Sequence, residues 1–370
     1  TVPSLRDALP LAMLVTALCA VPAYDLVLLM TNGGPGYATT TISFDAYGRA
    51  FGGIGQVGEG AALACLQGLV GLVLAAAALL VARGHERADG AIEAGAVRPA
   101  RRRARWSAGL LGLVAAALTL APLIWLLVLA VRPAQGLSVW ATLQANLAAV
   151  GSQGFAGALW SSLALALAVA ALALALAAPA AFALAMSRRR LLAVVAAVVL
   201  ALGIFQPTAV LIIPLFYLLN SLALLNSPAS VVLPQTARVL PMAVLLLWVG
   251  MRGLPAGVLE AAAVDGAAPR QVLRLIALPL LLPLVTVVGI WAFLSSWNDY
   301  LLPTVALQDE SIQTIPMALA HFIGRFDTQY ALLATGALLA VLPLLVLYAG
   351  LYGVMARGIR GLSWRAIPRG

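Results

Sequence analysis

The chain alternates between long apolar runs and short polar breaks. A helix needs about 20 mostly apolar residues to cross the hydrocarbon core of a bilayer. Runs of that length predict about eight transmembrane helices, at residues 9–31, 61–82, 107–131, 157–186, 191–219, 230–251, 279–302 and 328–356. None of these runs resembles a cleavable signal peptide, because no early basic region precedes a short apolar core. The pattern therefore predicts an all-α polytopic membrane protein.

The composition supports this class and excludes others. The chain is 63% hydrophobic and 9% charged, whereas soluble domains are close to half apolar and a quarter charged. The net charge of +9 is therefore no argument for a nucleic-acid partner. The sequence contains no lysine, which excludes a P-loop, because that loop needs its lysine on the nucleotide phosphates. We expect no catalytic residues, no metal site and no cofactor of its own, so that ATP and Mg²⁺ would belong to partner subunits.

The arginines indicate the orientation in the membrane. Cytoplasmic loops carry an excess of positive charge. Eighteen of the 22 arginines fall on one side of the expected spans, and Arg49, Arg132, Arg238 and Arg325 are left for the other. The count predicts a plasma-membrane protein with both ends of this chain in the cytoplasm, together with the polar break at 254–279.

That break, Leu254–Pro279, has the pattern of two short helices. Pro255 suits a first helical turn, where a missing N–H costs nothing. Gly266 can adopt the left-handed conformation that ends a helix, and Pro269 can begin the next one. An ordinary polar turn between membrane helices remains the alternative interpretation of these residues.

The break also resembles the EAA loop of ABC-importer permeases. The residues that carry the resemblance follow the family's order: Glu260-Ala261-Ala262, Asp265-Gly266, Ile276, Leu278 and Pro279. The resemblance implies the ABC type I importer permease fold and a cytoplasmic coupling helix that docks into a groove of an ATPase subunit. It implies that Glu260 and Asp265 lie at the ATPase interface, that Ala261 and Ala262 allow close approach, and that Gly266 sets the turn. Arg270 and Arg274 would either pair with ATPase carboxylates or form a solvated face.

Most of the remaining chain resembles the maltose-type carbohydrate permeases. Residues 1–88 are similar to the C-terminal end of the first permease subunit, notably at Tyr24-Asp25 and Thr31–Gly36. Residues 107–370 are similar to the complete second subunit, notably at Pro214–Tyr217 and Trp297–Tyr300. Residues 89–106 form an arginine-rich cytoplasmic linker. The resemblance implies a fusion that lacks the first subunit's early helices and one coupling loop.

Polar and aromatic residues late in the seventh span are candidates for a substrate path. Trp291, Ser295 and Asn298 share one helix face, and polar groups at membrane depth usually face a cavity or a partner helix. A belt at the outer membrane surface is the alternative for Asp299 and its neighbours. The full set of candidates is Trp291, Ser295, Trp297, Asn298, Asp299, Tyr217, Tyr24 and Asp25.

The resemblance implies an importer for a sugar or oligosaccharide. Its partners would be a dimer of ATPase subunits, an extracytoplasmic solute-binding protein, the lipid bilayer, and either another permease chain or a missing N-terminal portion. The first alternative is the same architecture serving a polyol phosphate or a polyamine. An ion-coupled secondary transporter is a further alternative, although no predicted span has an acid near its centre. A scaffold without transport activity would have no need of the EAA-like loop.

Overall fold

The computed structural model describes residues 33–51, 102–133, 138–187, 189–204, 208–309, 312–323 and 328–362, together with Val27 and scattered positions between 58 and 73. All the named elements in these residues are helices. The chain divides into two units, one made of Thr1–Arg98 and Leu191–Ser221, the other of Pro99–Arg190 and Leu222–Gly370. The predicted spans 9–31 and 61–82 and the linker residues 89–101 lie largely or wholly outside the described residues.

Three described helices belong to the first unit: α3 (Ile42–Phe51), α8 (Arg190–Ile204) and α9 (Thr208–Ser221). Helix α3 packs against α9. Arg49 of α3 pairs with Glu59 at 2.7 Å and with Asp45 at 3.1 Å, and these hydrogen bonds raise the pKa of its guanidinium. The span predicted at 191–219 contains two described helices, α8 and α9, and residues 205–207 between them lie outside the described residues.

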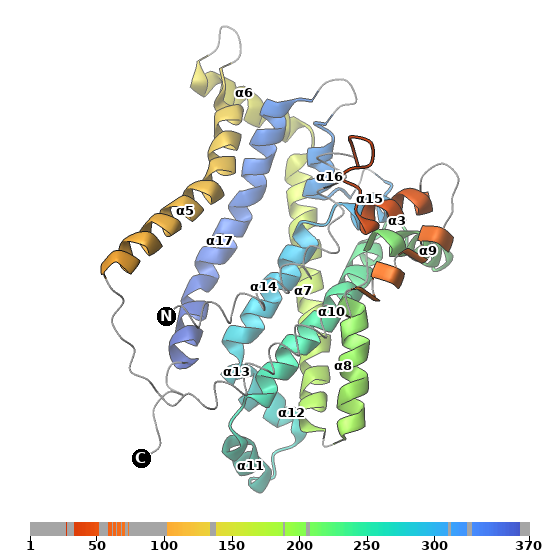
Figure 1. Ribbon diagram of the computed structural model, residues 1–370, viewed down its shortest axis with the longest axis vertical. Coiled ribbons are helices and arrows are strands. Elements are labelled where there is room, and N and C mark those ends of the chain that lie inside the picture. Colours follow the sequence, from red (N-terminus) through yellow and green to blue (C-terminus); the bar gives the residue numbers. More distant parts are fainter. Residues whose placement is uncertain are drawn as a thin grey trace. The chain divides into compact units, whose positions relative to one another are not determined.

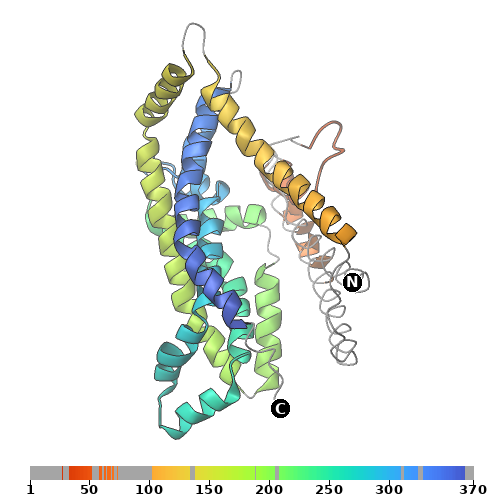
Figure 2. The same ribbon diagram turned by 90° about the vertical axis from the view of Figure 1, so that its left-hand side faces the viewer.

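The described part of the second unit is built on five long helices. These are α5 (Arg102–Val131), α7 (Phe155–Met186), α10 (Pro228–Arg252), α14 (Leu282–Trp297) and α17 (Tyr330–Leu362). Helix α5 is clearly inclined to α7 and α17 (Figures 1 and 2). Among the described residues, three helices are long and apolar enough to cross a membrane, or four if the bent pair around Leu281 counts as one. The predicted membrane class is therefore confirmed for this part of the chain, and α5 begins five residues before the expected start at 107.

Helix α7 packs against both α10 and α14, while α17 packs against α5, α6 (Val139–Ser152) and α14. One face of α7 is lined by alanines at the spacing of a helix stripe, all buried: Ala166, Ala170, Ala173 and Ala177. Small side chains let neighbouring helices approach closely, which favours packing in a membrane. Phe293 and Trp297 of α14 stack with ring centroids 5.4 Å apart and belong to the same core.

The seventh predicted span, 279–302, begins close to a sharp bend. The segment before the bend consists of α12 (Pro269–Gln271), the π-helix η1 (Val272–Ala277) and α13 (Leu278–Leu280), which together make an angle of 83° with α14. Pro283 stands in the first turn of α14, directly after the bend, where its missing N–H costs nothing. Beyond α14 the chain forms the short helices α15 (Leu301–Ala306) and α16 (Ile315–Ala320).

A close approach between α10 and α14 provides a test of this packing. A Cβ atom added at Gly250 of α10 would collide with Leu284 of α14, whereas one added at Gly157 of α7 would meet nothing within 4 Å. We predict that Gly250→Ala destabilises the protein by about 1–2 kcal/mol through overpacking. Gly157→Ala should be neutral or slightly stabilising, because alanine favours a helix. Thermal unfolding in detergent measures both variants, and equal melting temperatures would contradict the assigned contact.

Candidate functional site

The loop between α10 and α14 folds as its sequence pattern predicts. Helix α11 (Ala256–Val264) follows directly after Pro255. Gly266 has φ +72°, the left-handed conformation that favours glycine, and Pro269 begins α12. The side-chain oxygen of Gln271 accepts a hydrogen bond from the Ala268 N–H at 2.8 Å, which caps the start of α12. The expected pair of short helices separated by a glycine turn is confirmed.

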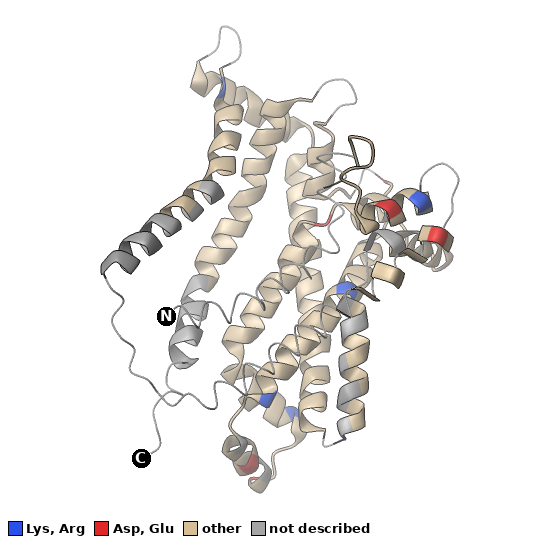
Figure 3. Cartoon of the chain, viewed as in Figure 1, with Lys and Arg blue, Asp and Glu red and all other residues tan. Residues whose placement is uncertain are grey.

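The tip of this loop exposes two acidic side chains. Glu260, Ala261 and Asp265 are exposed, and Figure 3 shows the acidic residue of α11 at the extreme end of the second unit, beyond the uncharged stretches of the long helices. The sequence analysis expected Ala261 and Ala262 both to allow close approach, but Ala262 is buried. Ala261 is exposed and is therefore the small residue that remains available for a partner.

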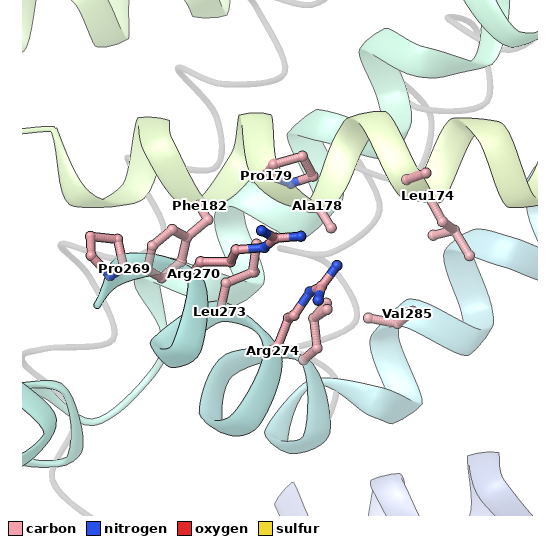
Figure 4. Close-up of a pocket in the computed structure, with 11 residues that line it drawn as sticks. Leu174, Ala178, Pro179, Phe182, Pro269, Arg270, Leu273, Arg274 and Val285 are labelled. Carbon is pink, nitrogen blue, oxygen red and sulfur yellow. The ribbon is translucent and has the colours of Figure 1, made fainter. Parts of the chain in front are cut away.

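The two arginines of the loop lie apart from the acidic tip. Arg270 and Arg274 line a pocket of about 650 Å³ between the loop and the end of α7. Figure 4 shows both guanidinium groups directed toward α7 near Pro179 and Ala178. Neither arginine has an ion pair with any residue that the structure describes. The loop therefore has two different faces, one acidic and exposed, the other basic and turned back toward a membrane helix.

A cluster of polar side chains joins α10 to the far end of α14. Asp299 is buried and its carboxylate accepts from Arg238 at 2.9 Å and from Gln235 at 3.1 Å. The Ser296 hydroxyl donates to the side-chain oxygen of Gln235, and Arg238 also donates to the Ser295 carbonyl at 3.2 Å. We call Gln235, Arg238, Ser296 and Asp299 the α10–α14 cluster. Buried charges need such partners, because an unpaired one would cost several kcal/mol.

The other substrate-path candidates have different environments. Trp297 is buried in the core, and Trp291 and Ser295 are partly buried, with the Ser295 hydroxyl donating to the Trp291 carbonyl. Asn298 is exposed and donates to the Leu294 carbonyl of its own helix. Tyr217 is exposed and belongs to the first unit. Tyr24 and Asp25 lie outside the described residues.

Three members of the cluster, Gln235, Arg238 and Ser296, are absent from the candidates of the sequence analysis. Gln235 and Arg238 lie within the apolar run 230–251, and the arginine count assigned Arg238 to the outer side. The structure places Arg238 inside α10. The sequence did contain a signal for this pairing, namely the charge of Arg238, because an arginine inside a membrane span almost always pairs with another polar group. Asp299 was the nearest candidate acid at a comparable depth.

Comparison with known proteins supplies independent information. A sequence profile of the family described as "Binding-protein-dependent transport system inner membrane component" matches residues 177–361, which is half of the chain. The arabinooligosaccharides transport system permease protein AraQ of Halalkalibacterium halodurans is 33% identical over 38% of this chain and 50% of its own length. The melibiose/raffinose/stachyose import permease protein MelC of Bacillus subtilis is 31% identical over 45% of this chain and 60% of its own length.

A solved structure shares the fold. The crystal structure of a bacterial ABC transporter involved in the import of the acidic polysaccharide alginate contains a chain with a TM-score of 0.56 and 19% identity, covering 70% of this chain and 99% of that one. The chain described here spans about 50% to 62% of the length of the first curated relatives it matches.

The pairing within the α10–α14 cluster can be measured directly. Asp299→Ala should destabilise the protein by about 2–3 kcal/mol, because it leaves Arg238 and Gln235 without their shared acceptor. Chemical denaturation in detergent gives the free energy of unfolding. Asn298→Ala is the matched control. The Asn298 side-chain amide donates to a carbonyl of its own helix, so this change should alter the free energy of unfolding by less than about 0.5 kcal/mol.

A double-mutant cycle isolates the ion pair. Asp299→Ala combined with Arg238→Leu should cost less than the sum of the two single changes by about 1 kcal/mol or more. Strictly additive effects would mean that the two charges do not interact.

Proposed function

Because the chain belongs to the family of binding-protein-dependent transport system inner membrane components, we propose that it is the transmembrane permease of an ABC importer for a sugar or oligosaccharide. It converts closure of partner ATPase subunits into alternating access across the cytoplasmic membrane. It carries out no bond chemistry itself, and ATP and Mg²⁺ are bound by the partners. An extracytoplasmic solute-binding protein delivers the substrate.

The observation that carries this proposal is the exposed acidic surface of α11. Helix α11 has nine residues and exposes much of its surface, with Ala262 buried. The carboxylates of Glu260 in α11 and of Asp265 directly after it are exposed, and Ala261 between them leaves room for another backbone. Complementary charge at such a surface orients a partner and speeds its association. An ATPase groove with basic residues fits this surface.

The described arginines support the cytoplasmic placement of the loop. Arg189 follows the end of α7, and Arg252 ends α10 next to the loop. Arg132 follows α5 at the opposite end of the second unit, close to α6 (Figure 1). This asymmetry agrees with the rule that positive residues gather on the cytoplasmic side.

The substrate class is inferred from the names of the relatives, which are permeases for arabinooligosaccharides and for melibiose, raffinose and stachyose. Within this chain, the candidates that remain free to meet a solute are Asn298, Trp291 and Ser295. Trp297 and Asp299 are buried, and they hold the end of α14 in position. An aromatic face beside hydrogen-bonding groups is the combination that a sugar requires.

Charge reversal on α11 tests the coupling role. Glu260→Lys should lower ATP-driven uptake by about tenfold or more, because it places a positive charge against a basic groove. Uptake of radiolabelled oligosaccharide into proteoliposomes that contain the assembled transporter provides the measurement, with protein abundance checked in parallel.

The matched control is Asp309→Lys, which makes the same charge change on an exposed residue far from the loop, after α15. Uptake by this control should equal that of the unchanged protein. Normal uptake by the Glu260→Lys variant, or ATP-independent transport by this chain alone, would reject the proposed function.

A further inference from the structure

We propose that the pocket between α7 and the α12–η1–α13 segment binds the phosphate headgroup of an anionic phospholipid from the cytoplasmic leaflet, through Arg270 and Arg274. This proposal rests on the cytoplasmic placement of the loop and is independent of the transported solute. It assigns the two arginines a role other than pairing with the ATPase.

The shape and lining of the pocket fit an amphiphile. Its volume of about 650 Å³ lies within the range of ordinary ligand sites, about 300–1,000 Å³. Of its 11 lining residues, Arg270 and Arg274 are the only ones with polar side chains. The remaining walls are aliphatic, aromatic or proline side chains from α7, from the loop and from α14.

The guanidinium groups lie between the two ends of the pocket. Figure 4 shows both of them beside Pro179 and Ala178, with Leu174 and Val285 further to one side. Leu174 lies four residues further from the end of α7 at Met186 than Ala178 does, a rise of about 6 Å. The part of the pocket beyond the arginines, deeper along α7, is therefore apolar, as the acyl region of a phospholipid is.

The guanidinium groups are available for an anion. Both arginines are exposed, and neither has an ion pair with a described residue. A guanidinium offers donors in a planar fork that matches phosphate oxygens in pairs. Two of them directed toward the same stretch of α7 form a site for one phosphate group.

The pocket favours a lipid over a carboxylate from a partner protein. An acidic side chain could pair with the arginines, but it would leave the deeper apolar walls uncovered. An acyl chain covers those walls, and each buried CH₂ group contributes about 0.8 kcal/mol. The cytoplasmic leaflet is also the source of negatively charged headgroups next to this end of the protein.

The π-helix gives such binding a structural consequence. Arg274 lies within η1, between the acidic tip of the loop and the 83° bend that leads into α14. A π-helical turn is rare and is frequently associated with functional sites. A headgroup held by both arginines would fix α12 and η1 against α7 and thereby limit the positions that α11 can take.

Lipid binding by the assembled transporter tests the proposal. Native mass spectrometry of the permease with its ATPase subunits measures the affinity for phosphatidylglycerol and, in parallel, for zwitterionic phosphatidylcholine. Removal of one basic residue beside an anionic lipid surface lowers the affinity for that lipid about fivefold. The double variant Arg270→Gln with Arg274→Gln should therefore bind phosphatidylglycerol about 30-fold more weakly. Binding of phosphatidylcholine should not change.

Control variants separate the site from general attraction to the membrane. Arg189→Gln removes an exposed charge that follows α7 outside the pocket, and it should change phosphatidylglycerol affinity by less than about twofold. Arg270→Lys with Arg274→Lys should give an affinity between those of the unchanged protein and the double glutamine variant, because the charge is kept but the planar fork is lost. Equal losses in the Arg189 and the double glutamine variants would overturn the proposal.

Two further outcomes would also overturn it. Inorganic phosphate that binds the arginines with the affinity of phosphatidylglycerol would identify a simple anion site, since the acyl chain would then contribute nothing. Loss of the ATPase subunits from the double glutamine variant, with lipid binding unchanged, would show that the arginines face the ATPase. Because lipid binding is measured without transport, neither result depends on the identity of the solute.

Discussion

An ionised carboxylate inside a bundle of apolar helices must be paired, and this constraint determines how α10 and α14 meet. The carboxylate of Asp299 is satisfied only if Arg238 and Gln235 lie within hydrogen-bonding distance. That requirement fixes the end of α14 to a point about two turns into α10. Apolar packing alone would tolerate sliding of one helix along the other, because lipid and helix surfaces are similarly apolar.

The same two helices are held a second time, close to the loop. Gly250 of α10 permits the approach of Leu284 of α14, and the chain between these residues contains α11, α12 and the π-helix. The antiparallel pair is therefore fixed at both ends, with the candidate coupling surface attached at one end and the polar cluster at the other. In the proposed mechanism, a displacement of α11 would be transmitted to the far side of the membrane through this helix pair. The basic pocket lies beside the bend in this pair, where a bound anion would act on the same movement.

The local structure of the loop could be predicted from the sequence more fully than the bending and packing of the membrane helices. Glycine and proline have strong local preferences, so Gly266 and Pro269 determined the loop anatomy without any knowledge of their neighbours. The bend before α14 lies within a long apolar run, and hydrophobicity alone does not locate it. Arg238 and Asp299 are separated by 61 residues, and no local pattern reveals that they meet. The burial of Ala262 and the orientation of the two arginines toward α7 likewise depend on tertiary packing.

The central claim is that α11 contacts an ATPase subunit, and disulfide cross-linking tests it most directly. Cys19 and Cys65 would first be replaced by serine, and single cysteines then introduced at the exposed positions Ala261 and, as a control, Gln308. With a cysteine scanned along the groove of the ATPase, mild oxidation should give a permease–ATPase adduct from Ala261→Cys and none from Gln308→Cys. ATP binding should alter its yield. The absence of any adduct from Ala261→Cys in an assembled and active transporter would contradict the account.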